Sequence, residues 1–540
     1  MDADRMKRNL CAFCAVPSVS HTPGERLFAP VLRSALEEIP YFQRHPEDIS
    51  VLPVSAREED GAMVFALMRA PGQVKKTILL LSHFDVVGVD EYGALRELAF
   101  SPLAYTQALR EGRFSLDADA QRYLESGNYL FGRGVCDMKW GIALDVELMH
   151  EFDAHPQEMK ANLLLVSVPD EERNSVGMLG AVEVLGAYAR ERDLELTACM
   201  VGEPNITPER DDSVRAMHIG AAGKVMPSFY CFGRVTHVGE PFAGLNAASL
   251  AAEITRRMEL SSEWVDAGEG FFTPAPMCLK MADLKEAYSV QSPSAAYCYF
   301  NVITASSTPE EIMERMERVA REAFEAVNEE RAGKHAACEK KLGKHIALTR
   351  FAPKVIRYEE LYRACVQAHG EAFEREIAAF IQANRELDVR ELSVRTVARV
   401  HDFYPEREPV VVLFLCPPFY PHTGLADPDG LVRRACMQMI AYGAQKGETL
   451  KVDECFMGLT DMSYLSLRMN VDTSALSACY PVWGTAYSLP LEQMRALDIP
   501  FVNFGPLGRD PHRASERVDL AYSFGKAPQL ALQLTRLLMA

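Results

Sequence analysis

The 540-residue sequence contains no run of about 18 uninterrupted apolar residues, so a membrane-spanning helix is not expected. Basic residues are outnumbered by acidic ones, 57 to 75, and the formal net charge is −18. This deficit argues against nucleic acids and anionic membranes as partners, because both require a basic surface. The segment from Met1 to Arg5 is acidic where a secretory signal would be basic, so a cytoplasmic location is expected.

The sequence also lacks the cysteine spacing of a disulfide framework. Its thirteen cysteines are scattered through a long chain, which favours reduced and mostly buried thiols. Cys11 and Cys14 form a CxxC pair within an apolar helical pattern, but no second pair accompanies them. Since a structural zinc site needs four ligands, helix packing is the simpler interpretation of this pair.

The length exceeds that of one compact core, so two or more domains are expected. Apolar strand patterns at 77–81, 163–168 and 198–201 alternate with helical spacing at 141–152 and 175–190. This alternation predicts a doubly wound α/β domain.

The pattern changes after about residue 222. The next segments predict a smaller α+β unit inserted into the first domain: strands at 225–235 and 297–304, and helices at 246–260 and 309–331. A charged, largely helical segment follows at 333–408, before an apolar strand at 410–415. We therefore expect residues 1–220 and 419–540 to form one discontinuous domain, with 221–418 inserted.

An apolar run from Leu79 to Val87 carries a histidine, His83, with Asp85 two residues on. Side chains at the carboxyl ends of parallel strands face the crevice where ligands bind. Asp85 shares a strand face with His83 and could hydrogen-bond its second ring nitrogen. Taken alone, a histidine near a strand end is more often a satisfied core or surface residue.

Further carboxylates follow downstream, each in a turn or at the end of a predicted strand. Asp137 lies in a glycine-flanked turn that opens a helix. Asp170, Glu171 and Glu172 follow a buried strand, and like charges so close repel unless a cation or proton is shared. A solvated acidic turn is the alternative for this motif. Glu203 ends another apolar run.

Near the other end of the chain, His512 lies in a loop rich in glycine and proline. Hydrolysis with two metal ions needs one bridging carboxylate, a histidine and a carboxylate for each ion, and an acid–base carboxylate that is not a ligand. The sequence supplies this ligand count and leaves Glu171 over as the acid–base group. The candidate ligands are His83, Asp137, Glu172, Glu203 and His512.

These motifs resemble those of the M20 metallopeptidases and amidohydrolases, a family of carboxypeptidases, deacylases and aminoacylases, over nearly the whole chain. The resemblance implies a mixed-sheet α/β catalytic domain with an inserted ferredoxin-like lid. It implies that Glu171 is the catalytic base and that Asp85 orients His83. It assigns one zinc ion to His83, Asp137 and Glu203, and a second to Asp137, Glu172 and His512. These ligand types also accept cobalt or manganese.

The segment 233–247 is similar to the family's lid segment, in which a histidine reaches the active site of a partner subunit. By that resemblance His237 polarises the substrate or its oxyanion, and the chain forms a homodimer through the lid. Without it, His237 is more simply a surface residue at a strand end. The segment 458–461 is similar to a late motif near the cleft, although a plain turn explains it equally well.

The lid departs from the family pattern in one respect. Where many members carry Asp-x-Arg, the segment 300–304 places Asn301 and no arginine. Arg509 or Arg513 could substitute as the group that binds a substrate carboxylate. With the extra helical segment, these features resemble the arginine-utilisation branch.

The expected function is therefore metal-dependent cleavage of an amide bond in a small N-acyl amino acid or short peptide, in arginine or amino-acid catabolism. Two alternatives remain. One is an aminopeptidase of the same fold, and the other is a metal-binding relative without turnover.

Overall fold

The computed structural model describes residues 1–55, 61–205, 213–268, 271–424, 427, 429–469 and 471–540. The chain divides into two compact units. The first comprises Met1–Ala221, Thr423–Arg468 and Pro490–Ala540, and the second comprises Ala222–His422 and Met469–Leu489.

The sequence-based boundaries leave residues 419–422 and the segment Met469–Leu489 with the first domain, whereas both lie in the second unit, and Ala221 lies in the first. The segment Met469–Leu489 lies in the second unit because hydrogen bonds tie it to the backbone of that unit. The Leu415 N–H donates to the Cys479 carbonyl at 2.9 Å, and the Phe419 N–H donates to the Tyr487 hydroxyl at 2.9 Å.

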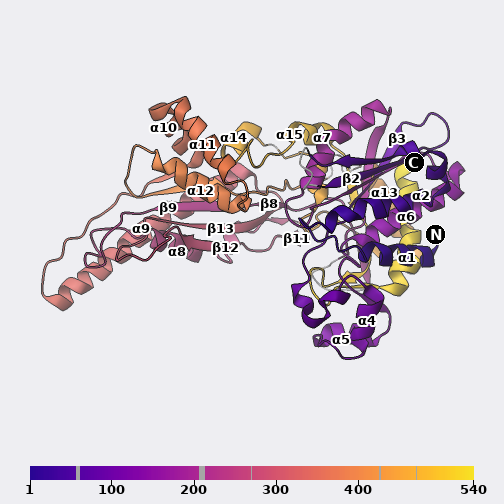
Figure 1. Ribbon diagram of the computed structural model, residues 1–540, viewed down its shortest axis with the longest axis horizontal. Helices are drawn as coiled ribbons and strands as arrows, with labels where there is room; N and C mark the ends of the chain where they lie inside the picture. Colours follow the sequence, from indigo (N-terminus) through magenta and orange to yellow (C-terminus); the bar gives the residue numbers. More distant parts are fainter. Residues whose placement is uncertain (56–60, 206–212, 269–270, 425–426, 428, 470) are drawn as a thin grey trace. The chain divides into compact units, whose positions relative to one another are not determined.

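The first unit is built on a mixed sheet whose central strands are parallel (Figure 1). Strand β3 is a run of aliphatic residues buried on both faces, as parallel strands between helix layers are. In spatial order the described strands are β1 (Ile49–Pro53), β2 (Ala62–Met68), β5 (Asn162–Val168), β3 (Lys76–His83), β6 (Glu195–Val201), β17 (Phe501–Asn503), β7 (Val214–His218) and β16 (Thr449–Asp453). The predicted doubly wound α/β fold is confirmed.

Helices cover both faces of this sheet. On β2, Val64 and Ala66 join the core beneath α6, whereas the Phe65 ring packs on Tyr188 of α7 with centroids 5.0 Å apart on the other face. The helices of this unit are α1 (Ala3–Cys14), α2 (Phe28–Glu37), α3 (Pro40–Arg44), α4 (Pro102–Arg110), α5 (Ala118–Glu125), α6 (Lys139–Ala154), α7 (Val176–Glu191), α13 (Leu431–Gln445), α15 (Leu491–Leu497) and α16 (Ala527–Met539).

A small antiparallel sheet completes the first unit and joins distant parts of the chain. Its strands are β18 (Gly508–Arg509), β19 (Arg517–Asp519) and β4 (Tyr129–Phe131). Because β19 pairs with β4, the loop that carries His512 is held next to the chain that enters the Asp137 turn.

The second unit contains a sheet with helices on both faces (Figure 1). Helices α8 and α9 cover one face, and α10 to α12 pack on the other through one apolar cluster. Its strands are β12 (Met277–Asp283), β13 (Ala295–Thr304), β9 (Pro227–Phe232), β15 (Val410–Leu415) and β14 (Val355–Arg357), with β8 (Gly223–Val225) beside β13. A two-stranded ribbon joins β10 (Ala267–Gly268) and β11 (Phe271–Phe272).

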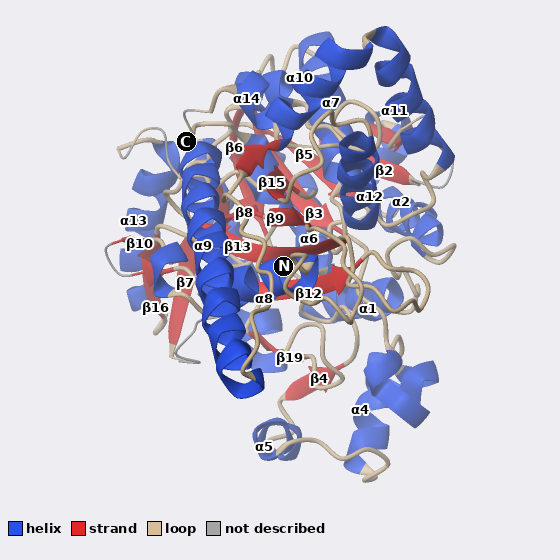
Figure 2. Cartoon of the chain, turned by 90° about the vertical axis from the view of Figure 1, so that its left-hand side faces the viewer, coloured by secondary structure: helices blue, strands red, loops and turns tan. Residues whose placement is uncertain are grey.

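Two sequence-based elements of this unit are corrected. The strand predicted at 225–235 is two strands, β8 and β9, broken before Pro227, whose nitrogen carries no hydrogen to donate. The helix predicted at 309–331 continues as α9 (Pro309–Leu342), a single long helix (Figure 2). It begins with a capping box between Thr308 and Glu311 and ends at Gly343 in the left-handed conformation.

The segment that follows α9 forms three helices on the sheet. They and a short helix from the returning segment are α10 (Tyr358–His369), α11 (Glu371–Ala383), α12 (Val389–Asp402) and α14 (Thr473–Ala478). The helix predicted from the pattern around Cys11 and Cys14 is α1, and Cys14 packs in its buried face. In the part of the chain that the structure describes, no helix has the length and apolarity to cross a membrane.

Candidate metal centre

Three neighbouring parallel strands of the first unit deliver their functional residues to one edge of the sheet. His83 is the last residue of β3 and lies opposite Val168, the last residue of β5. Leu81 lies opposite Val201, the last residue of β6. The acidic turn after β5 and Glu203 after β6 therefore flank His83.

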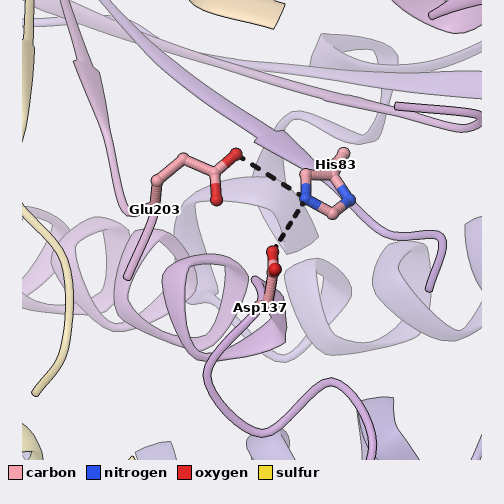
Figure 3. Close-up of side chains that lie close together, drawn as sticks. All are labelled: His83, Asp137 and Glu203. Atoms are coloured by element: carbon pink, nitrogen blue, oxygen red, sulfur yellow. Dashed lines mark ion pairs between the residues drawn. The ribbon is translucent and has the colours of Figure 1, made fainter. Parts of the chain in front are cut away.

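His83 and two carboxylates form the first cluster (Figure 3). The His83 Nε2 atom lies 3.4 Å from Asp137 Oδ1 and 3.6 Å from Glu203 Oε1. The Thr460 hydroxyl donates to the same Glu203 oxygen at 3.4 Å. His83 and Glu203 are buried, so these groups face one another with little water between them.

Asp137 also belongs to a second cluster through its other oxygen. Asp137 Oδ2 lies 3.2 Å from His512 Nε2, and Glu172 Oε2 lies 2.9 Å from the same nitrogen. The His512 side chain is 51% exposed, and its φ of 65° is in the left-handed region that residues other than glycine rarely adopt. Asp170, next to Glu171, has the same φ of 65°. Such backbone conformations concentrate at functional sites.

Asp85 connects the histidine to the acidic turn. Its Oδ1 atom lies 3.4 Å from His83 Nδ1 and accepts a hydrogen bond from the Glu171 backbone at 3.0 Å. Its Oδ2 atom accepts from the Glu172 backbone at 3.2 Å and from the Ser20 hydroxyl at 2.7 Å. Asp85 is fully buried. The His83 Nδ1 atom also lies 3.2 Å from the Asp85 backbone carbonyl oxygen. Asp85 therefore fixes the ring of His83 through both its backbone and its side chain, and its carboxylate holds the backbone of the turn.

Glu25, which the sequence motifs do not include, holds the same turn from the other side. Its Oε1 atom accepts from the Asp170 N–H at 2.9 Å, and its Oε2 atom accepts from the His21 N–H at 2.9 Å. The His21 ring in turn contacts Asp170 Oδ1 at 2.7 Å. Burial and the nearby Asp85 raise the pKa of Glu25 to about 8. Carboxylates thus bind three consecutive backbone N–H groups, those of residues 170 to 172.

Glu171 lies close to the first cluster. Its Oε2 atom is 4.0 Å from His83 Nε2, and its side chain is 9% exposed. Burial raises the pKa of Glu171 well above its usual value, and the nearby Glu203 and Asp461 carboxylates add to the rise. The raised pKa favours proton uptake by this carboxylate.

Burial and mutual repulsion also govern the ligand carboxylates. Burial, with Asp137 nearby, raises the pKa of Glu172 to about 7, and burial raises that of Glu203 to about 8. Asp137 is the exception: burial opposes its charged form, but the neighbouring imidazoles of His512 and His83 outweigh burial and lower its pKa. Burial opposes the charged form of His512, but Asp137 and Glu172 raise its pKa to about 11. The carboxylates of Asp137, Glu172 and Glu203 therefore surround positions that favour a positively charged group.

The residues present fit divalent metal ions. The His83 Nε2 atom is buried, and no hydrogen bond satisfies it among the described residues. In each cluster the potential ligand atoms lie within 4.8 Å of one another. Imidazole nitrogens and carboxylate oxygens are the ligands of hydrolytic zinc sites.

Glycines allow the backbone segments that carry the predicted ligands to lie very close to one another. A Cβ atom on Gly202 would lie 2.7 Å from the Cα atom of Gly141, in the first turn of α6. A Cβ atom on Gly505 would lie 1.8 Å from the Glu203 carbonyl oxygen. Glycine at these positions allows the end of β6 to meet the start of α6, which brings Glu203 to Asp137.

Arg133 and Glu516 support the Asp137 turn, although the sequence motifs do not identify them in that role. Arg133 Nη1 donates to Glu516 Oε2 at 2.7 Å, and both side chains are buried. Glu516 Oε1 accepts from the backbone N–H groups of Cys136 and Asp137 at 3.3 and 3.4 Å. The sequence carries one signal that could have identified them: Arg133 lies within a few residues of Asp137, and Glu516 within a few residues of His512.

The structure brings together, in the first unit, all five predicted ligands with Glu171 and Asp85. The remaining predicted site residues are not members of these two clusters. Arg509 is buried on β18 and Arg513 is exposed one residue after His512. In the second unit, His237 is exposed and its Nδ1 atom accepts from the Gly239 N–H at 3.1 Å, while Asn301 pairs with Met277 on β12.

Comparison with known proteins shows which family, relatives and solved structures this chain resembles. Residues 79–502 match the family model for peptidase family M20/M25/M40. Protein YqjN of Bacillus subtilis (strain 168) is 35% identical over 534 residues, covering 98% of this chain and 95% of YqjN. Protein RocB of the same organism is 29% identical over 545 residues, covering 99% of this chain and 94% of RocB. The crystal structure of aminopeptidase PepT from Bacillus cereus ATCC 10987 covers 100% of both chains with a TM-score of 0.56 and 14% identity, a likeness of fold.

Proposed function

The chain belongs to peptidase family M20/M25/M40, as its motifs predict, and on this premise we propose that it uses two divalent metal ions to hydrolyse an amide bond in a small N-acyl amino acid or short peptide. The position of Asp137 carries this proposal. One of its oxygens faces His83 and Glu203, and the other belongs to the cluster of Glu172 and His512.

In this proposal His83, Asp137 and Glu203 hold one ion, and Asp137, Glu172 and His512 hold the other. Zinc is the expected metal, and cobalt or manganese suit the same ligands. When bound, such ions polarise the scissile carbonyl and lower the pKa of water from 15.7 towards about 7.

Glu171 is the proposed acid–base residue. Its carboxylate accepts a proton from the attacking water and donates it to the departing nitrogen, which leaves as an amine. Two properties suit it to this role. Its Oε2 atom lies 4.0 Å from His83 Nε2, and burial raises its pKa, which favours the protonated form that donates to the departing nitrogen. Asp85 positions Glu171 through its backbone N–H.

Replacement of Glu171 by Gln tests the assignment, because Gln preserves the shape of the side chain and removes the base. We expect kcat to fall by about 10²–10⁴ while metal content is unchanged. Full activity of Glu171→Gln would exclude Glu171 as the base. In parallel, metal analysis of the purified wild type should find close to two ions per chain, and a content below one that added metal does not restore would exclude the two-metal site.

We further propose that the second unit is a lid through which the chain forms a homodimer, and that His237 acts on the substrate of the partner subunit. The edge strand β12 supports an interface there, since it exposes Met277, Leu279 and Met281, with exposed fractions of 54%, 48% and 50%.

Subunit complementation tests this arrangement. Glu171→Gln and His237→Ala chains, each inactive alone, should regain part of the wild-type activity when they are mixed and exchanged. In the mixed dimer one site combines an intact Glu171 with an intact His237 from the partner. If mixing restores no activity although mixed dimers form, His237 does not act across the interface.

For substrate recognition we propose Asn301, Arg509 and Arg513, and a role in arginine or amino-acid catabolism, which the full-length similarity to RocB supports. A screen of N-acyl amino acids and dipeptides, including arginine and ornithine derivatives, tests the substrate class. The fold shared with PepT favours an aminopeptidase as the second candidate. An aminopeptidase would cleave amides of amino acids with a free amine and spare their N-acyl forms.

A further inference from the structure

The second unit contains a cavity of about 510 Å³ that has no assigned role. Its walls come from α10, from α11 and from the returning segment 477–485. This volume lies within the range of about 300–1,000 Å³ that small-molecule sites occupy. All of the lining residues belong to the second unit, whereas the proposed ligands and base belong to the first.

Aromatic rings line the cavity from two directions. Tyr358 and Tyr362, one turn apart on α10, have ring centroids 5.9 Å apart. Tyr480 and Trp483 on the returning segment have centroids 5.7 Å apart. The faces of tyrosine and tryptophan rings carry negative electrostatic potential and attract cations.

The charged side chains of the lining leave an excess of negative charge. Glu359 lies 3.8 Å from Arg363, which balances it. Glu374 on α11 forms no ion pair in the described parts of the chain. Glu374 and Tyr362 line the same cavity, and burial, with the Glu374 carboxylate after it, raises the pKa of Tyr362. An unbalanced carboxylate beside aromatic rings favours a cationic guest.

Apolar side chains supply the rest of the surface. Ile377 and Ile381 lie one turn apart on α11, on the helix face that carries Glu374, and Val366 faces the cavity from α10. An alkyl chain can bury its surface against these residues while a terminal charge reaches the carboxylate.

We propose that this cavity binds a small organic cation, an alkylammonium or alkylguanidinium compound. The charged group lies at Glu374 between the aromatic rings of Tyr362 and Trp483, and the alkyl body packs against Ile377 and Ile381. The site is separate from the metal centre and does not depend on the proposed hydrolysis.

Trp483 provides a direct signal for binding. The chain has three tryptophans, and Trp140 and Trp264 are 0% and 1% exposed, so Trp483 is the one that lines the cavity and reaches solvent. The full-length, metal-loaded protein is titrated with N-butylguanidinium and, separately, with N-butylurea. The two probes have nearly the same shape and differ in charge. Calorimetry repeats each titration without relying on fluorescence.

We expect a saturable change in fluorescence with butylguanidinium and binding at least about tenfold weaker with butylurea. Glu374→Gln should weaken butylguanidinium binding by at least about fivefold. The matched control is Glu371→Gln, the same charge change on the same helix at a residue that pairs with Arg375 and does not line the cavity. Trp483→Phe should abolish the fluorescence response.

Three results would overturn the proposal: no saturable binding of butylguanidinium by either method, equal affinity for the two probes, or equal affinity of the Glu374→Gln and Glu371→Gln proteins. Equal affinity for the two probes would show that the cavity selects apolar shape and not charge. The Glu371 and Glu374 side chains are both exposed, so circular dichroism and the Tm of both variants should match those of the wild type.

Discussion

The Glu171 backbone N–H donates a 3.0 Å hydrogen bond to Asp85 Oδ1, the oxygen that also faces His83 Nδ1. The residue that orients the first histidine therefore also holds the turn that carries the proposed base. Metal site and base are positioned by one buried carboxylate, which explains why they are adjacent in space although about 90 residues separate them in sequence.

Replacement of Asp85 by Asn should damage both functions at once. The backbone N–H groups of Glu171 and Glu172 donate to different oxygens of this carboxylate and cannot accept, so the Asn amide nitrogen would oppose one of them with a second donor. We expect metal affinity or kcat/KM to fall by about 10–100-fold. Competition with a chelator and steady-state kinetics measure the two effects.

Asp90→Asn is the matched control, because Asp90 is 95% exposed and forms an ion pair only with Arg96 in the described parts of the chain. It should behave as the wild type does. An Asp85→Asn protein with unchanged metal affinity and unchanged kinetics would remove Asp85 from both roles.

Metal affinity should rise with pH between about 6 and 8. In the metal-free protein burial raises the pKa of Glu172 to about 7 and that of Glu203 to about 8, so both are partly protonated in this range. A metal ion must displace these protons, so binding weakens as the pH falls through these values, by about tenfold per pH unit for each proton released. Calorimetry in buffers of different ionisation enthalpy counts the protons, and affinity that stays constant across this range would contradict the assignment.

Replacement of Gly202 by Ala should destabilise the first unit and weaken the metal site. The added Cβ atom would lie 2.7 Å from the Gly141 Cα atom, so a backbone, and not a flexible side chain, would have to move. We expect the free energy of unfolding to fall by about 1–3 kcal/mol, measured by urea denaturation.

Gly186→Ala serves as the control for this change. Gly186 lies within α7, and its added Cβ atom would meet only the end of the Arg190 side chain, at 3.6 Å. Alanine there should be neutral or stabilising by about 0.5–1 kcal/mol. If both variants unfold at the same urea concentration, the contact between β6 and α6 is not constrained as proposed.

Replacement of Arg133 by Met should be strongly destabilising, because it leaves the Glu516 carboxylate buried without its cation. The expected loss is about 3–5 kcal/mol of unfolding free energy. Adding Glu516→Gln to this variant should recover part of the loss, since the amide oxygen can still accept from the Asp137 N–H. Urea denaturation of the single and double variants checks this, and an additive double variant would show that the two residues are not coupled.

Much of the centre was predictable because its residues sit at local boundaries in the sequence. An aliphatic run such as β3 must be buried, and a histidine or carboxylate at its carboxyl end must face the crevice. This argument finds His83, Glu172 and Glu203 without coordinates. The Asp137 turn is identified by its glycines and by the helix that follows it.

The supporting residues were not predictable in this way. Glu25 and Glu516 bind backbone N–H groups that are 145 and 379 residues away in sequence, and nothing in their local sequence marks these contacts. The strand expected at 225–235 is broken before Pro227, although both of its pieces, β8 and β9, pair with β13.

The sequence by itself determined the family, the α/β alternation and the types of ligand, since periodicity and strand-end chemistry are local properties. Tertiary structure alone decided that Asp137 faces both histidines and that Met469–Leu489 joins the second unit. It also decided that Trp483, Glu374 and the tyrosines of α10 line one cavity. These relationships depend on packing between distant segments, which no local pattern records.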